Sequence, residues 1–309
     1  MIRRASSTRL FLVTSLLQLL VFGSRPAHAQ SATASDDPPG VQASPNSAAT
    51  SAQTQDDDAA ALDLAEPDFT VVNIPTTLRL PRHKGTFHLT HRFNGNLRSG
   101  SFSDQLSNLF GIDQGATVGF EYRFGVTRHL EAAAYRSTFD KTIQLYGKYD
   151  ALHQGAAGAQ GGASAILNWV SISGLVSIEG SNNFQERFQP ALGAVVSRKF
   201  WDRVAVYGAP IWVHNSAAAL DIDRDTFYVG LAARGRIRPT IYLTGEFSPR
   251  AAGYAPGQSE YGFGVEARVG AHVFQLTFTN TSGTTFGQIA RGGNPDALYM
   301  GFNLTRKFF

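Results

Sequence analysis

Arginine and glutamate side chains recur at alternate positions in segments whose other positions are apolar or small. They are Arg92, Glu121, Arg123, Arg234, Arg236, Glu246, Glu266 and Arg268. Such a set predicts one of two arrangements. The arginines line a water-filled pore that favours anions, or they pair with the glutamates and fill a narrow lumen with an ionic network. Because a charge that is neither paired nor hydrated is unfavourable in a protein interior, one of the two is required.

A second candidate for chemistry is His214-Asn215-Ser216, which has the His-x-Ser spacing of outer-membrane phospholipases. Residues two apart on a strand face the same way, as a general base and its nucleophile require. Any chain with 8 histidines yields such pairs by chance, so we favour a strand end followed by a turn. We therefore predict no catalytic residues and keep lipid hydrolysis by His214 and Ser216 as an alternative.

The residue types argue against metals, cofactors and nucleic acid. With no cysteine in the chain, zinc-thiolate sites, iron–sulfur sites and covalent haem are excluded. His88 and His91 differ by an odd number of positions, so on a strand they face opposite sides and cannot chelate one ion. The Gly155–Gly162 stretch lacks the lysine and helix of a phosphate loop and predicts a turn. No known nucleic-acid motif is present.

The charged residues are positioned by strands, as the hairpin from Tyr261 to Thr279 illustrates. Tyr261, Phe263, Val265 and Val269 alternate with glycine, glutamate and arginine. Each strand therefore has one apolar face and one polar or small-residue face. In a soluble sandwich the apolar face would be the core, whereas in a membrane barrel it would face lipid.

Repetition of this pattern from Lys84 to Phe309 predicts an all-β fold, a single antiparallel up-and-down transmembrane β-barrel of about twelve strands. Short connections such as Gly125–Arg128 and Ala271-His272 contrast with long ones such as Asn96–Gly115 and Asn280–Asp296. Outer-membrane barrels have short periplasmic turns and long outer loops. One short helix is expected, around Phe286–Ala290. An interfacial aromatic girdle is predicted from Trp169, Trp201, Trp212, Tyr207 and Phe200.

Two segments precede the barrel. A basic start, an apolar run over Leu10–Phe22 and Ala27-His28-Ala29 predict a signal peptide at residues 1–29. Residues 30–68 hold 8 acidic residues and no lysine or arginine, so we predict a disordered acidic periplasmic segment. The barrel domain is placed at 69–309, with Phe69–Leu80 as an extended lead-in. Residues 69–309 carry 23 basic and 16 acidic side chains, a formal charge of +7.

Three stretches resemble a bacterial β-barrel family catalogued as a domain of unknown function. They are Gly270–Asn280, Gly245–Pro249 and Gly301–Arg306, and the resemblance covers roughly Phe69 to Phe309. The resemblance implies a barrel in the bacterial outer membrane, and it implies no activity and no catalytic residue. The terminal aromatic Phe309 is the expected signal for the barrel-assembly machinery. The partners expected are therefore this machinery, membrane lipid and lipopolysaccharide.

From these features we predict a non-enzymatic outer-membrane protein, with passive diffusion of small solutes, anions in particular, as the first interpretation of its function. A sealed barrel that acts structurally or through its outer loops is the second, and an outer-membrane lipid hydrolase the third. A soluble, lipid-free barrel of the lipocalin kind would need a polar exterior, which the apolar strand faces argue against.

Overall fold

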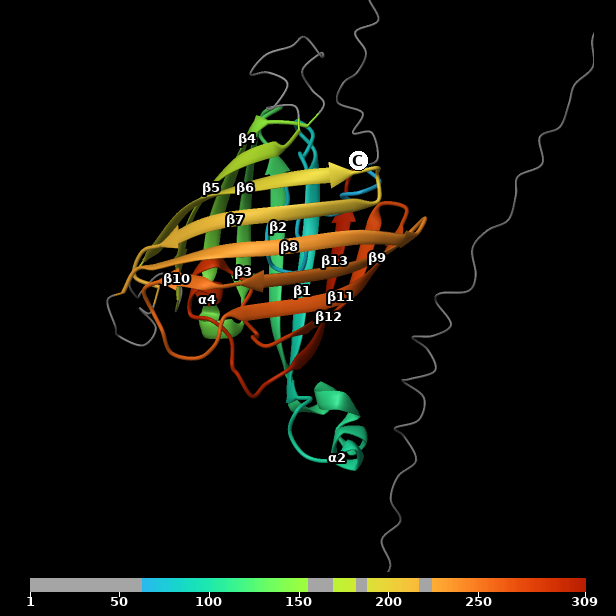
Figure 1. The fold of residues 1–309 in the computed structure, drawn as a ribbon, viewed down its shortest axis with the longest axis vertical. Coiled ribbons are helices and arrows are strands. Elements are labelled where there is room, and N and C mark those ends of the chain that lie inside the picture. The colour runs from blue at the N-terminus through green and yellow to red at the C-terminus, as the bar shows by residue number, and fades with distance from the viewer. Residues whose placement is uncertain (1–62, 155–168, 182–187, 217–223) are drawn as a thin grey trace, which may run out of the picture. The chain divides into compact units, whose positions relative to one another are not determined.

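A computed structural model describes residues 63–154, 169–181, 188–216 and 224–309. These residues fold into a closed antiparallel β-barrel of twelve strands, as the alternation predicted (Figure 1). β9 and β10 count as one strand, because both pair with β8 and only Pro249 interrupts them. Pairing of β1 with β13 and of β8 with β9 closes the sheet. The strands are β1 (Gly85–Asn96), β2 (Ala116–Gly125), β3 (Leu130–Ser137), β4 (Ile143–Leu152), β5 (Ser171–Gly180), β6 (Gln189–Phe200), β7 (Val204–Val213), β8 (Thr226–Arg238), β9 (Ile241–Ser248), β10 (Arg250–Ala252), β11 (Glu260–Val269), β12 (His272–Thr279) and β13 (Tyr299–Lys307).

The barrel wall has its apolar face outside and its polar face inside. On β11, Phe263 is 47% exposed and points outward, whereas Glu266 is fully buried. On β12, Phe274 points outward and Gln275 is buried. A soluble protein has the opposite arrangement, so this exterior is suited to lipid and a lipid-free barrel is not supported.

Three tryptophans of the predicted girdle lie on the outside of the barrel: Trp201, in the β6–β7 turn, is 88% exposed, and Trp169 and Trp212 are also exposed. Tyr207, also predicted for the girdle, is instead buried inside the barrel and 4% exposed. Its place follows from the alternation on β7, where Tyr207 shares the inward face with Ala205 and Ala209.

The barrel has a short-turn end and a long-loop end. β1 begins and β13 finishes at the short-turn end, where β6–β7, β8–β9 and β11–β12 are joined by two or three residues. The long-loop end carries α4 (Phe286–Ala290), where a short helix was predicted. It also carries α2 (Phe102–Ser107) and the 3-10 helix η2 (Leu109–Gln114), which were not predicted; another 3-10 turn, η3 (Phe139–Lys141), joins β3 and β4. The Ser101–Asp104 capping box is the sequence signal that could have predicted α2.

No helix in the described ranges is long and apolar enough to cross a membrane.

The expected boundary at residue 68 falls within a segment that is packed inside the barrel. Residues 65–77 are all buried, so 65–68, assigned above to a disordered segment, belong to the folded domain. The predicted signal peptide, most of the acidic segment and the Gly155–Gly162 turn lie outside the described residues.

Candidate functional site: the barrel lumen

Residues 63–80, here called the lumen segment, enter the barrel and fold back on themselves. Val71 donates to the carbonyl of Ile74 at 2.9 Å, and Thr76 donates to that of Phe69 at 2.9 Å. Thr70 and Pro75 form an isolated antiparallel bridge below this turn. The segment leads into β1, which begins at residue 85 at the short-turn end of the barrel. The chain therefore returns to the short-turn end after the turn inside the lumen. It is therefore a hairpin-like insertion with its tip at residues 71–74.

One carboxylate accepts hydrogen bonds from three consecutive backbone N–H groups of the tip. Glu246 accepts hydrogen bonds from the backbone N–H groups of Val72 at 3.0 Å, Asn73 at 2.9 Å and Ile74 at 3.0 Å. Consecutive N–H groups at a turn form a concave anion-binding site, and bonds to an ionised acceptor are stronger than neutral ones. Glu246 on β9 thus binds the lumen segment through its backbone.

Amide side chains on two other strands bind the carbonyl groups of the same tip. Gln275 donates to the carbonyl of Val71 at 2.6 Å, and Asn303 donates to that of Val72 at 2.9 Å. Gln275 and Asn303 also bond each other at 2.8 Å. The polar groups of the buried tip are therefore paired with the wall, as groups removed from water require.

Cationic side chains of the lumen bind the two legs of the hairpin. Arg234 donates to the carbonyl of Thr70 at 2.6 Å and pairs with Glu266 at 2.9 Å. Lys148 donates to the carbonyl groups of Thr76 at 3.2 Å and Leu78 at 2.7 Å. These cations bind the lumen segment where an open pore would hold water.

Arg92 reaches the tip from β1. Its guanidinium donates to the side-chain oxygens of Asn73 at 3.1 Å and Asn303 at 2.8 Å. At the base of the segment, the Thr77 and Ser197 hydroxyls are 2.5 Å apart and Asp63 pairs with Lys199. The segment is therefore held along its length.

The last loop enters the barrel from the opposite end. All residues of α4 are buried. Glu179 on β5 accepts hydrogen bonds from the Thr285 hydroxyl at 3.0 Å and the Gly287 N–H at 3.2 Å. Gln144 on β4 supports Glu179 at 3.0 Å. The lumen is thus occupied from both ends.

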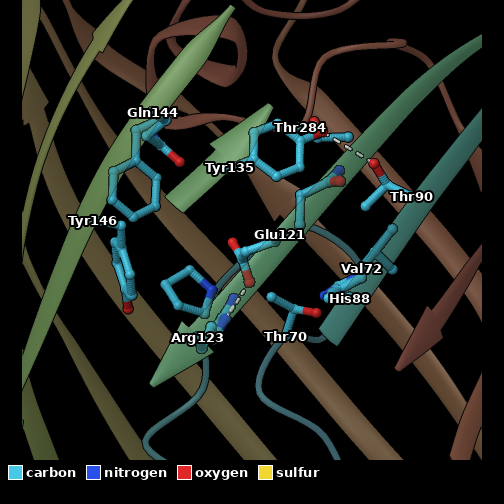
Figure 2. Close-up of a pocket in the computed structure, with 13 residues that line it drawn as sticks. Thr70, Val72, His88, Thr90, Glu121, Arg123, Tyr135, Gln144, Tyr146 and Thr284 are labelled. Carbon is cyan, nitrogen blue, oxygen red and sulfur yellow. Dashed lines mark hydrogen bonds and ion pairs between the residues drawn. The ribbon is translucent and has the colours of Figure 1, made fainter. Parts of the chain in front are cut away.

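A small cavity of about 40 Å³ remains between the lumen segment and the wall formed by β1–β4 (Figure 2). His88, Glu121, Arg123 and Tyr146 lie on its wall side, with Thr70 opposite. One water needs about 10–15 Å³, so the cavity has room for a few waters. The His88 Nε2, Thr70 Oγ1 and Tyr146 hydroxyl atoms have no hydrogen-bond partner among the described residues, which fits water there.

The predicted lumen residues divide into two groups. Arg92, Arg123, Arg234, Glu246 and Glu266 are buried inside the barrel. Glu121 is partly exposed and pairs with Arg123, which also approaches Glu131 at 3.5 Å. Arg236 and Arg268 are partly exposed near the short-turn end and do not join the contacts described above. The assignment of all eight predicted residues to a conducting pore remains a prediction.

Other lumen groups were not predicted. Lys148 shares the inward face of β4 with Tyr146, and Glu179 shares that of β5 with Ser177, so strand alternation could have predicted both. Gln275 and Asn303 lie in the stretches quoted for the family resemblance, but nothing in their types indicates contact with residues 71–72.

His214 and Ser216 do not form a hydrolytic pair. Asn215 has a left-handed backbone, φ 53°, so the two side chains do not face the same way. His214 is exposed and bonds Asp225 at 2.7 Å, whereas Ser216 is fully buried and bonds the Thr226 hydroxyl at 2.8 Å. The strand argument failed because β7 ends at Val213.

An apolar exterior around a polar, occupied lumen defines a membrane-spanning β-barrel. The chain belongs to the family described as a membrane-bound beta barrel domain (DUF5777), whose model matches residues 68–308, and the resemblance noted in the sequence is confirmed. No curated protein matches.

Solved structures of outer-membrane porins and channels are similar to this chain at low identity. The NanC porin has a TM-score of 0.45 and 7% identity, over 73% of this chain and 100% of its own. The KdgM porin has a TM-score of 0.44 and 6% identity, over 73% and 99%. An outer-membrane channel from Pseudomonas putida F1 has a TM-score of 0.41 and 10% identity, over 74% and 97%.

Proposed function

We propose that the protein is a bacterial outer-membrane channel that its own lumen segment holds closed. The observation that carries the proposal is the fit of residues 63–80 inside the barrel, with the tip bound by Glu246, Gln275 and Asn303. With this segment in place, the cavity beside it admits a few waters only. Passage of a solute therefore requires the segment to leave the lumen.

The chemistry of the wall supports a channel behind the closure. Phe69, Val71 and Ile74 are buried apolar groups of the segment. The Phe69 ring lies beside the cationic groups of Arg123, Lys148 and Lys307, and Ile74 lies against Gly230 on β8. Once they leave, Glu246, Arg234 and their neighbours face a space that water can enter. A charged and amide-rich wall is then hydrated, as in a diffusion pore.

The buried lumen charges do not favour the anion preference predicted above. The buried cations of the strands are Arg92, Arg123, Lys148 and Arg234, and the buried acids are Glu131, Asp150, Glu179, Glu246, Glu260 and Glu266. Acids are at least as numerous as cations on this wall. We therefore propose small polar solutes as the permeant class, without selection for anions.

A disulfide lock tests the proposal directly. The chain has no cysteine, and the Thr77 and Ser197 hydroxyls are 2.5 Å apart, so Thr77→Cys with Ser197→Cys can cross-link the segment to β6. The oxidised protein in a planar bilayer should be silent, and reduction should restore the brief openings expected of the unmodified barrel. Each single cysteine variant is the control. Equal conductance before and after reduction would contradict closure by the segment.

The second candidate is a permanently sealed barrel with a structural or surface-loop role, favoured by the closure at both ends. It predicts that the reduced double-cysteine protein and the Glu246→Ala variant are both folded, inserted and silent. The two candidates are therefore separated by the same recordings.

A further inference from the structure

Two short turns meet at the short-turn end of the barrel and bring three arginines together. Arg236 on β8 donates its N–H to the carbonyl of Arg203, in the β6–β7 turn, at 2.7 Å. Arg203, Arg236 and Arg238 line a surface cavity of about 180 Å³, together with Ile237 and Pro239. We call this cavity the arginine pocket.

The arginine pocket has no acidic partner in the described part of the chain. None of the ion pairs between described residues includes Arg203, Arg236 or Arg238. The nearest carboxylate in sequence, Asp202, is exposed in the same turn and joins none of those ion pairs. Three guanidinium groups around one cavity attract an anion with several oxygen acceptors, and phosphate fits their geometry.

The pocket lies where the apolar exterior ends. Ile237, 55% exposed, lines it and points outward, and Val204 and Val206 continue the apolar face along β7. Trp201, in the same turn as Arg203, is the kind of residue found at the level of lipid headgroups. A lipid phosphate bound at this height would place its acyl chains over Ile237 and Val206.

We propose that Arg203, Arg236 and Arg238 form a binding site for the phosphate of an anionic phospholipid headgroup. The lipid belongs to the leaflet at the short-turn end, which is the periplasmic side in outer-membrane barrels. Its acyl chains contact the apolar outer face of β7 and β8. This site is independent of the closure of the lumen.

Quenching of Trp201 fluorescence tests the site. The chain has 3 tryptophans, so Trp169→Phe with Trp212→Phe leaves Trp201 as the single reporter. The protein is refolded into phosphatidylcholine vesicles that contain a small fraction of brominated phosphatidylglycerol, or of brominated phosphatidylcholine as the reference. A pocket specific for the anionic headgroup should give much stronger quenching with the brominated phosphatidylglycerol.

The substitutions Arg203→Gln, Arg236→Gln and Arg238→Gln together remove the pocket charge. Because each arginine near an anionic lipid surface strengthens association about five-fold, the preference for phosphatidylglycerol should fall by up to about 100-fold. The matched control is Arg82→Gln, Lys84→Gln and Arg128→Gln, three exposed cations at the same end of the barrel. This control should keep the preference.

Three results would overturn the proposal. The first is that the pocket variant keeps the preference for phosphatidylglycerol. The second is that the control variant loses this preference equally, which would mean attraction by overall charge. Alternatively, millimolar glycerol phosphate abolishes the selective quenching, which would make the ligand a soluble phosphate.

Discussion

Replacing Glu246 by alanine should release the lumen segment. The substitution leaves the backbone N–H groups of Val72, Asn73 and Ile74 without their acceptor. A hydrogen bond to a charged group contributes about 1.5–3 kcal/mol, and a buried unpaired donor costs about 1–3 kcal/mol. Allowing for water that enters the vacated space, we expect a shift of about 3–6 kcal/mol toward the withdrawn segment. That corresponds to about 10²- to 10⁴-fold in the equilibrium.

The position of the segment can be measured apart from conductance. Val72 is 1% exposed and the chain has no cysteine, so Val72→Cys places a single thiol at the buried tip. A membrane-impermeant maleimide should label this thiol slowly in the otherwise unmodified barrel. It should label the Glu246→Ala variant at least about 10²-fold faster, in line with the shift in the equilibrium. Conductance recorded on the same protein should show a higher open probability.

Glu179→Ala is the matched control, because Glu179 is a buried lumen glutamate that binds Thr285 and Gly287 of the last loop and not the segment. Labelling of Val72→Cys should be unchanged in this variant. If Glu246→Ala leaves the thiol protected in a folded barrel, binding of the tip by Glu246 is not what keeps the segment inside. If Glu246→Ala raises labelling without raising conductance, the last loop is sufficient to close the barrel. The double variant Glu246→Ala with Glu179→Ala should then conduct.

Three further predictions concern the lumen, the outer face and the last residue of the chain. Arg234→Gln should destabilise the folded barrel by about 3–5 kcal/mol in equilibrium unfolding from detergent, because it leaves Glu266 buried and unpaired; a loss below 1 kcal/mol would mean that water replaces the pair. Leu276→Arg, on the outer face, should cost about 2–4 kcal/mol near the bilayer midplane, and an equal stability of variant and unmodified protein in lipid would place this face away from lipid. Deletion of Phe309 should slow assembly by the barrel-assembly machinery in reconstituted membranes while leaving spontaneous folding in detergent unchanged, and equal rates in both would contradict its role as an assembly signal.

Strand period and residue type predicted much of the barrel wall. Because successive side chains on a strand alternate between faces, Phe263 and Glu266 had to point in opposite directions once β11 was identified. A charged side chain on the lipid face is costly, which selected the inward direction for Arg234 and Glu246. The same reasoning failed at His214 and Ser216, where the strand had already ended.

The sequence by itself therefore determined a membrane-facing barrel with a charged interior, and only the tertiary structure decided what fills that interior. Glu246 binds residues 72–74 across a separation of 172–174 positions, through backbone N–H groups. Arg234 and Lys148 likewise bind backbone carbonyl groups. Since every residue except proline carries the same N–H and C=O, binding of this kind leaves no pattern of side chains to recognise. Closure of the barrel brought the Glu246 carboxylate and the Arg234 guanidinium to one lumen, and the folded chain alone showed that the lumen segment occupies it.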